Sequence, residues 1–452
     1  MRAMTRRWFG TDGVRGVAGV APMRAEDAFA LGRAATERLR EIGRERPSFV
    51  LGMDPRISSA MLARAFTAAA LARGADVTDV GVLPTPGVAF LTQHVGADAG
   101  VMISASHNPF HDNGVKLFDA NGEKLSDEEE LAIEAWLDRD EADHRTVQGA
   151  DVGRMRTLDG SRDGYVKFLL EHAPFLDGLR VGLDCANGAA SVVAPLVFEK
   201  LGARLQTRSA SPDGVNINVA CGSTAPEALQ DFVLAEGLEV GVAFDGDGDR
   251  AVLVDGRGRL VTGDHMIAII GRVRRDKAVV GTTMTNLGVE RWLAGHDVAL
   301  HRADVGDRYV HALLRERNLR LGGEASGHVL FLDLAPTGDG ILTALQTLAA
   351  VRASGKPLEA WMDEIPIYPQ VLTSVRVNPD QKHAVAAHAD LKAAVAELEE
   401  RLAGEVRVNV RPSGTEPLVR VMVEGEDASV IEREASQLVQ LVERLGGTVN
   451  PA

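Results

Sequence analysis

Helix-like and strand-like hydrophobic patterns alternate along the chain, and this alternation limits its possible folds more than any other feature. An amphipathic helical pattern over 23–42 precedes an apolar strand pattern at 48–54, and a second helical pattern over 58–74 precedes a strand at 76–83. Such alternation is typical of a mostly parallel sheet whose faces are covered by helices. We therefore expect an α/β unit in the N-terminal third of the chain.

The same alternation starts again at residue 178 and once more after residue 255, whereas the last 85 or so residues follow another order. There the pattern predicts a strand at 371–377, a long helix over 383–403, two strands at 406–410 and 418–425, and a helix over 428–446. A chain of 452 residues exceeds what one hydrophobic core usually supports. The expected architecture is three related mixed α/β sheet domains and a smaller C-terminal α+β domain, with boundaries at 1–150, 151–255, 256–367 and 368–452.

Charge and composition exclude several classes of function. A formal net charge of −15 argues against nonspecific nucleic-acid binding and against binding to anionic membranes. Two cysteines, Cys185 and Cys221, cannot form a disulfide framework and match no zinc spacing; Cys185 lies in an apolar stretch and is expected to be buried. Neither a signal-peptide pattern nor a membrane-length apolar run occurs, so we expect a cytoplasmic protein.

The hexapeptide Ser-Ala-Ser-His-Asn-Pro at 104–109 directly follows an apolar strand pattern. Because α/β proteins place ligands at the carboxyl ends of strands, Ser106 is a candidate nucleophile that a neighbouring base or charge would activate. No G-x-S-x-G sequence occurs, which weakens an acyl-transfer interpretation. The alternative is a turn formed by Asn108 and Pro109, and the motif by itself leaves both interpretations open.

A second loop, 245–250, places Asp245, Asp247 and Asp249 at alternate positions between glycines. Three carboxylates this close repel one another unless a cation lies between them, and carboxylate oxygens suit a hard divalent cation. An EF-hand calcium loop is excluded, because its sixth position is Arg250 rather than glycine and its twelfth is Gly256 rather than glutamate. The loop predicts a divalent-metal site, and Mg²⁺ is favoured for its use with phosphate oxygens.

Two further loops carry polar groups. The loop at 322–328 offers Glu324, Ser326 and His328 for hydrogen bonds to a polyol, although a tight turn explains it equally well. The loop at 411–417, with Arg420 beyond it, combines two arginines, two hydroxyls and a glycine. Converging N–H groups and guanidinium groups form a phosphate cradle, which we favour there over a plain hairpin.

These four loops, in this order, resemble the α-D-phosphohexomutase superfamily over essentially the whole chain. The segments that carry the resemblance are FGTDGVRG (9–16), SASHNPFHDNGVKLF (104–118), DGDGDR (245–250), GEASGH (323–328) and RPSGTEPLVRV (411–421), and their wording is most similar to the bacterial phosphoglucosamine mutases. The resemblance implies a central cleft enclosed by four domains. It also implies interconversion of glucosamine-6-phosphate and glucosamine-1-phosphate through a phosphoserine enzyme and a bisphosphate intermediate, in the synthesis of cell-wall amino sugars.

The resemblance also implies roles for matching residues. Ser106 would carry the phosphoryl group, with His107 beside it, and one Mg²⁺ would bind Ser106 and the three aspartates. Arg15, Lys116 and His328 would stabilise charge or transfer protons, and Arg250 would lie close to the reacting phosphate. Glu324 and Ser326 would bind sugar hydroxyls. The non-reacting phosphate would be bound by Arg411, Ser413, Gly414, Thr415 and Arg420. A hexose bisphosphate would act as activator.

Three alternatives stay open at this point. The same chemistry on glucose or mannose phosphates is the nearest one. A metal-dependent phosphatase would use the aspartate loop but gives no reason for the serine and arginine loops, and a sugar-phosphate-binding regulator would not need a phosphorylatable serine beside a metal site. The expected partner is a hexosamine phosphate, with no nucleic acid or membrane, and the sequence leaves the oligomeric state, a homodimer included, undecided.

Overall fold

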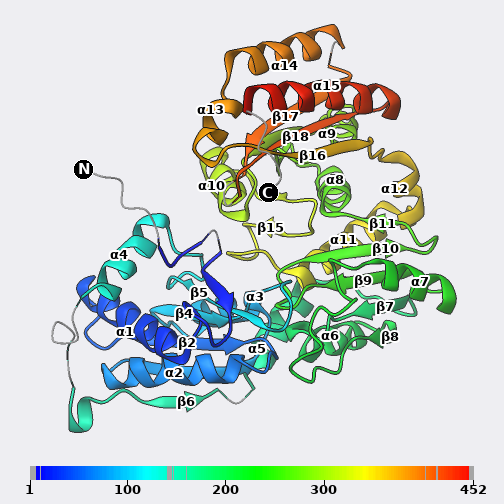
Figure 1. The fold of residues 1–452 in the computed structure, drawn as a ribbon. Coiled ribbons are helices and arrows are strands. Elements are labelled where there is room, and N and C mark those ends of the chain that lie inside the picture. The colour runs from blue at the N-terminus through cyan, green and yellow to red at the C-terminus, as the bar shows by residue number, and fades with distance from the viewer. Residues whose placement is uncertain are drawn as a thin grey trace.

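The computed structural model describes residues 7–10, 12–139, 145, 147–158, 160–402, 404–413 and 416–446, and the strands in these ranges form four sheets that follow one another along the chain (Figure 1). The first sheet contains β1 (Val14–Val17), β2 (Ser48–Met53), β3 (Asp76–Val82), β4 (Ala99–Ile103), β5 (Asp112–Phe118) and β6 (Met155–Thr157), in the order β1-β5-β4-β2-β3-β6. Its helices are α1 (Ala25–Glu41), α2 (Ser59–Ala72), α3 (Thr85–His94) and α4 (Asp127–Leu137).

The second and third sheets repeat this layout. The second contains β7 (Arg180–Asp184), β8 (Arg204–Arg208), β9 (Val240–Phe244), β10 (Ala251–Asp255) and β11 (Leu260–Val261), with helices α5 (Ser161–Glu171), α6 (Ala194–Lys200) and α7 (Glu227–Glu236). The third contains β12 (Ala278–Thr282), β13 (Ala299–Ala303), β14 (Leu321–Gly323) and β15 (Val329–Phe331), with helices α8 (Gly263–Arg274), α9 (Leu287–Ala294), α10 (Asp307–Arg317), α11 (Gly340–Ser354) and α12 (Leu358–Glu364).

In each of these three sheets, parallel pairs give way to an antiparallel pair at one point. β2 pairs in parallel with β3 and β4, and β4 then pairs antiparallel with β5. β7, β9 and β10 repeat the change, as do β12, β14 and β15. The three connections that follow β4, β9 and β14 are the serine, aspartate and Glu324–His328 loops. The expected relation among three α/β units is thus confirmed in topology, and it places the candidate loops at equivalent points.

The C-terminal part has a small antiparallel sheet of β16 (Gln370–Arg376), β17 (Val406–Pro412) and β18 (Leu418–Gly425), in the order β16-β18-β17. Helix α15 (Ala428–Gly446) packs on it, and the expected α+β layout is confirmed. The predicted single helix over 383–403 is wrong, because α13 (Lys382–Ala386) ends before α14 (Ala389–Arg401) begins. His388 caps α14 instead, since its Nδ1 accepts a hydrogen bond from the amide of Asp390.

Apolar packing joins the first three sheets more closely than the fourth. One buried cluster runs from Val50 and Tyr165 through Phe244 to Ile341, whereas the C-terminal sheet builds a separate cluster with α15. In Figure 1 the first sheet (blue to cyan) and the second (green) accordingly lie at one end of the molecule, and the C-terminal helices α14 and α15 at the other. Cys185 is buried as expected, and none of the described helices is long and apolar enough to cross a membrane.

Candidate active site

Ser106 lies in the connection between β4 and β5 and is fully buried. Its backbone has a φ of 52°, in the left-handed region that residues other than glycine rarely adopt. The Ser106 hydroxyl donates a hydrogen bond to Asp245 Oδ2 over 2.6 Å, and His107 Nδ1 lies 3.3 Å from the same Oγ. Burial, Arg250 and Arg15 lower the pKa of His107, so its imidazole is neutral near pH 7 and can accept a proton.

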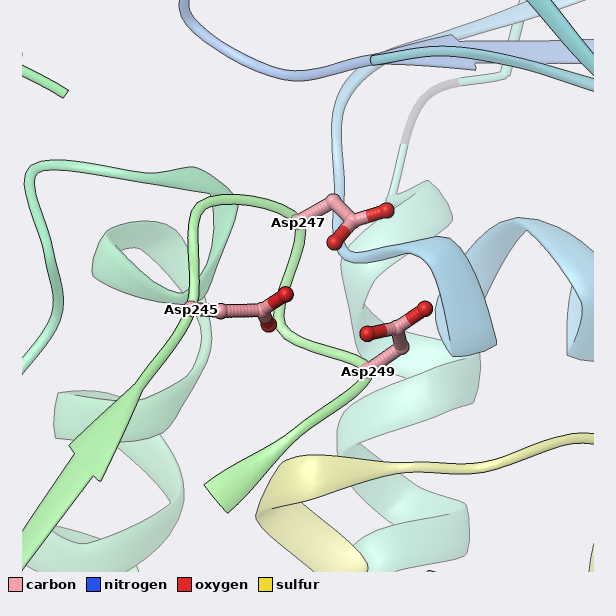
Figure 2. Close-up of side chains that lie close together, drawn as sticks. All are labelled: Asp245, Asp247 and Asp249. Atoms are coloured by element: carbon pink, nitrogen blue, oxygen red, sulfur yellow. The ribbon is translucent and has the colours of Figure 1, made fainter. Parts of the chain in front are cut away.

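The aspartate loop joins β9 to β10, and its three carboxylates are directed toward one space (Figure 2). One oxygen from each of Asp245, Asp247 and Asp249 lies within 4.8 Å of the others, and all three side chains are buried. Within the described part of the chain, Asp247 Oδ1 and Asp249 Oδ1 are buried without a hydrogen-bond partner. Burial and then the two neighbouring carboxylates raise the pKa of Asp245 well above its usual range. The donor set therefore fits a divalent cation.

Lys116 reaches the aspartate loop from β5, next to the serine strand β4. Its Nζ lies 2.8 Å from Asp247 Oδ2 and 3.3 Å from Asp249 Oδ2, and only 2% of the side chain is exposed. Burial opposes the charged amine, but Asp12, Asp247 and Asp249 together raise its pKa well above the usual range. Lys116 is therefore an ammonium ion that lies against two of the three carboxylates and reduces their repulsion.

Glu324, Ser326 and His328 lie in the loop between β14 and β15 and line a cavity of about 480 Å³, which Arg15, His107 and Arg250 also line. Glu324 Oε1 accepts a hydrogen bond from the amide of Gly306 over 3.0 Å. Burial opposes protonation of His328, but Asp249 and Asp307, whose oxygens lie 3.7 and 3.4 Å from its ring nitrogens, raise its pKa. The third loop thus offers an acceptor, a hydroxyl and a donor to one ligand.

The arginine loop joins β17 to β18, and the structure does not place its described residues in the lining of this cavity. Arg411 on β17 lies directly opposite Arg420 on β18 in the antiparallel strand register. Partial burial and Arg420 lower the pKa of Arg411, while Asp304, next to the cavity-lining Val305, acts in the opposite sense. Of the described loop residues, Arg411 is thus in electrostatic reach of Asp304. Gly414 and Thr415 lie outside the described residues.

Charged groups that the sequence analysis did not assign surround these loops. Asp12 Oδ2 lies 3.1 Å from Lys116 Nζ, and its other oxygen lies 2.5 Å from Lys124 Nζ; Lys124 also pairs with Asp307. Asp12 lies in the same segment, FGTDGVRG, as Arg15, so the sequence could have indicated Asp12 as a site residue. Nothing in the sequence indicated Lys124.

The lining of the cavity contains charged groups of both signs, although the chain as a whole is negatively charged. It combines the cations Arg15, Lys124, Arg250 and Arg308 with the carboxylates Asp12, Asp249, Asp307 and Glu324. These basic groups are paired with carboxylates in the structure, for example Arg15 with Asp12 and Lys124 with Asp12 and Asp307.

Comparisons with known proteins agree with this geometry. Models of phosphoglucomutase/phosphomannomutase domains match the chain in sequence: alpha/beta/alpha domain I at 6–144, domain II at 163–258, domain III at 262–368 and the C-terminal domain at 372–441.

Individual relatives extend over nearly the full length. Phosphoglucosamine mutase of Deinococcus deserti is 50% identical over 441 residues, which cover 98% of this chain and 99% of the relative. Phosphoglucosamine mutase of Thermus thermophilus is 50% identical over 436 residues, which cover 96% of this chain and 98% of the relative. A solved phosphoglucomutase/phosphomannomutase family protein from Burkholderia thailandensis superposes with a TM-score of 0.82 at 25% identity, covering 97% of each chain. N-acetylphosphoglucosamine mutase of Aspergillus fumigatus, solved with GlcNAc-6P and magnesium, shares the fold with a TM-score of 0.72 at 17% identity over 99% of this chain and 97% of that one.

Proposed function

The chain belongs to the phosphoglucomutase/phosphomannomutase family, and on that premise we propose that it interconverts glucosamine-6-phosphate and glucosamine-1-phosphate. The relatives named above, which share half of its residues over nearly its whole length, carry this activity in their names. The product is a precursor for amino-sugar nucleotides and hence for the cell wall. The enzyme is an isomerase that moves a phosphoryl group between two hydroxyls of one sugar.

One observation carries the mechanism: the Ser106 hydroxyl donates a 2.6 Å hydrogen bond to a cluster of buried carboxylates beside the cavity. A hydroxyl in such a place is a phosphoryl acceptor when nearby charge stabilises the transferred group. We assign the phosphoserine to Ser106. Asp245, Asp247 and Asp249 would hold Mg²⁺, which supplies positive charge that stabilises the phosphoryl oxygens during transfer.

The transfer itself requires one proton movement in each half-reaction. As the bond between phosphorus and Ser106 Oγ breaks, a bond forms between phosphorus and a sugar hydroxyl oxygen; that hydroxyl gives its proton to a base, and the departing Oγ takes up one proton in return, so the half-reaction releases none. His107, whose neutral ring lies 3.3 Å from Oγ, is suited to shuttle the proton on the serine side. Lys116, Arg15 and His328 stabilise charge, and Arg250 stays beside the reacting group.

The substrate must present each of its ends to Ser106 in turn, through a hexosamine 1,6-bisphosphate. Glu324 and Ser326 bind the sugar hydroxyls. The arginine loop, formed by Arg411, Ser413, Gly414, Thr415 and Arg420, binds the phosphate that is not reacting. The separate apolar core of the C-terminal sheet supports this division of labour between four units, 1–150, 151–255, 256–367 and 368–452. A trace of hexose bisphosphate would keep Ser106 phosphorylated.

The decisive experiment follows purified protein, with Mg²⁺ and a trace of hexose bisphosphate, on glucosamine-6-phosphate, glucose-6-phosphate and mannose-6-phosphate. Fastest formation of the 1-phosphate from glucosamine-6-phosphate supports the proposal, and preference for another sugar would change the substrate alone. Release of inorganic phosphate without isomerisation would indicate a phosphatase instead. Ser106→Ala should abolish turnover with its folding intact, whereas Ser429→Ala, at an exposed serine, should not. Normal turnover by Ser106→Ala would refute the phosphoserine mechanism.

A further inference from the structure

The backbone of Ser106 is held on both sides by side chains that the mechanism does not use. Its amide donates a hydrogen bond over 2.9 Å to Ser104 Oγ, and that hydroxyl donates over 2.7 Å to Asp54 Oδ2. Its carbonyl accepts over 2.8 Å from Arg56 Nη2 and over 2.9 Å from Asn218 Nδ2. Both hydrogen-bonding groups of this one residue are therefore fixed by the protein.

Asp54 and Arg56 form one buried unit just after β2. Arg56 Nε lies 2.8 Å from Asp54 Oδ2, and neither side chain is exposed. The guanidinium also donates to the carbonyl of Asn108 over 2.8 Å and to that of Asp112 over 3.2 Å. A planar group with five donors can hold several carbonyls at fixed positions, which a lysine cannot do.

Asn218 approaches the same loop from the second sheet, in the segment between β8 and α7. Its Nδ2 donates to the carbonyls of Ser106 and Asn108, the two that Arg56 Nη2 also holds. Two donors from different parts of the fold thus converge on the same pair of carbonyls: Arg56 lies 50 and 52 residues before them and Asn218 lies 112 and 110 residues after them. This convergence ties the serine loop of the first sheet to the segment between β8 and α7 of the second.

We propose, on the basis of the phosphoserine role proposed above for Ser106, that Asp54, Arg56 and Asn218 are positioning residues that hold the Ser106 backbone in its left-handed conformation and so direct Oγ to Asp245. A left-handed conformation of a residue other than glycine is strained and persists only where its surroundings enforce it. Released from the carbonyl donors, the loop relaxes and Oγ leaves the position 2.6 Å from the carboxylate. A displacement of about 1 Å can slow a positioned reaction by about 10²-fold.

The test uses Asn218→Gly, because Asn218 itself has a φ of 60° and glycine keeps that conformation while it removes the amide donor. Ala220→Gly is the matched control: Ala220 lies two residues further on, also left-handed with a φ of 49°, and offers no side-chain donor. For full-length protein, kcat and KM for glucosamine-6-phosphate would be measured, together with Ser106 phosphorylation by intact mass after incubation with hexose bisphosphate.

We expect Asn218→Gly to lower kcat about tenfold or more and to slow Ser106 phosphorylation in parallel, with KM within about twofold and Tm within about 3 °C of wild type. Ala220→Gly should retain wild-type kcat. A raised KM at unchanged kcat, wild-type kinetics in Asn218→Gly, or an equal kcat loss in both variants would overturn the inference. Absence of phosphate on Ser106 in the wild-type protein would instead refute the proposed function, and this inference with it.

Arg56→Lys provides a second measurement. It keeps the charge opposite Asp54 but removes the fork of donors, so kcat should fall at least as far as in Asn218→Gly while KM again changes little. Should Arg56→Lys lose its near-UV circular dichroism and fail to fold, the Asn218→Gly result decides the question. A folded Arg56→Lys variant with wild-type kcat would contradict the role of the guanidinium.

Discussion

Single residues in the active site have protonation states that their neighbours set. Lys116 is an ammonium ion because Asp12, Asp247 and Asp249 outweigh its burial, and the pKa of Asp245 is raised by burial and by the two carboxylates beside it. The raised pKa of Asp245 reflects the mutual repulsion of three close carboxylates, which a divalent cation bound between them would relieve.

The first prediction concerns that cation. Mg²⁺ should raise the Tm of the wild-type protein by a few degrees, because a ligand that binds only the folded state stabilises it by mass action. Asp247→Asn should remove this rise and lower kcat at least about 100-fold, since the site loses a charged ligand. Asp297→Asn, at an exposed aspartate, should behave like wild type. Differential scanning calorimetry with Mg²⁺ and with EDTA measures the effect, and an undiminished rise in Asp247→Asn would place the cation elsewhere.

At the scale of elements, each candidate loop of the first three sheets lies where a parallel pair gives way to an antiparallel one. The connections after β4, β9 and β14 are therefore equivalent, and three sheets packed around a shared apolar cluster bring them to one cavity. The order of motifs in the chain was visible in the sequence, and its spatial meaning follows from this repeated topology.

The second prediction concerns the N-terminus of helix α11. Its N-cap, Asp339, accepts hydrogen bonds from the amide of Leu342 over 2.9 Å and from the Tyr165 hydroxyl over 2.7 Å. Burial raises the pKa of Asp339 to about 6. A carboxyl group whose pKa is higher in the folded state contributes stability at low pH that is lost as pH rises through about 6.

Asp339→Asn keeps a capping acceptor without this titration. The difference in unfolding free energy, variant minus wild type, should therefore increase by about 2 kcal/mol from pH 4.5 to pH 7.5, because only the wild type loses the stabilisation from protonated Asp339. Urea denaturation at the two pH values measures the difference, and Asp363→Asn, at an exposed carboxylate, serves as the control. A difference that stays constant with pH, or one that falls, would contradict the shifted pKa.

At the scale of the whole molecule, the C-terminal sheet has its own core, and Arg407 on β17 both pairs with Glu424 on the neighbouring strand β18 and reaches the third unit at Thr283. Arg407 donates to Glu424 Oε2 over 2.6 Å and to the carbonyl of Thr283 over 2.9 Å, and Glu424 is fully buried. The ion pair lies within the C-terminal sheet, and the bond to the Thr283 carbonyl joins that sheet to the connection after β12 of the third sheet.

The third prediction follows from the burial of this pair. Arg407→Met leaves Glu424 without its counter-charge and should destabilise the protein by about 3–5 kcal/mol. The double variant Arg407→Met/Glu424→Met removes both charges and should recover most of that loss, because a buried pair contributes little net free energy beyond an apolar pair of similar volume. Thermal unfolding followed by circular dichroism compares the three proteins. A double variant no more stable than Arg407→Met would show that the pair itself, not the orphaned carboxylate, governs stability.

Much of this protein was open to prediction from local sequence. The α/β alternation, the C-terminal α+β order and the aspartate triplet depend on residues close together in the chain, so periodicity and spacing reveal them. The exception is the helix expected over 383–403, where the helical pattern runs on through Ala387. His388 instead begins a second helix as its N-cap, and a histidine ring that accepts a hydrogen bond from a backbone amide has little signature in composition.

What the tertiary structure alone decided is which charges meet. Lys124 contacts Asp12 and Asp307 across 112 and 183 residues, and the donors on the Ser106 carbonyl come from 50 residues before it and 112 after it. Residue types and their local spacing determined which groups can perform phosphoryl transfer. Burial and distance between remote segments set their charge and orientation, because electrostatic free energy depends on separation in space and on exclusion of water rather than on position in the chain.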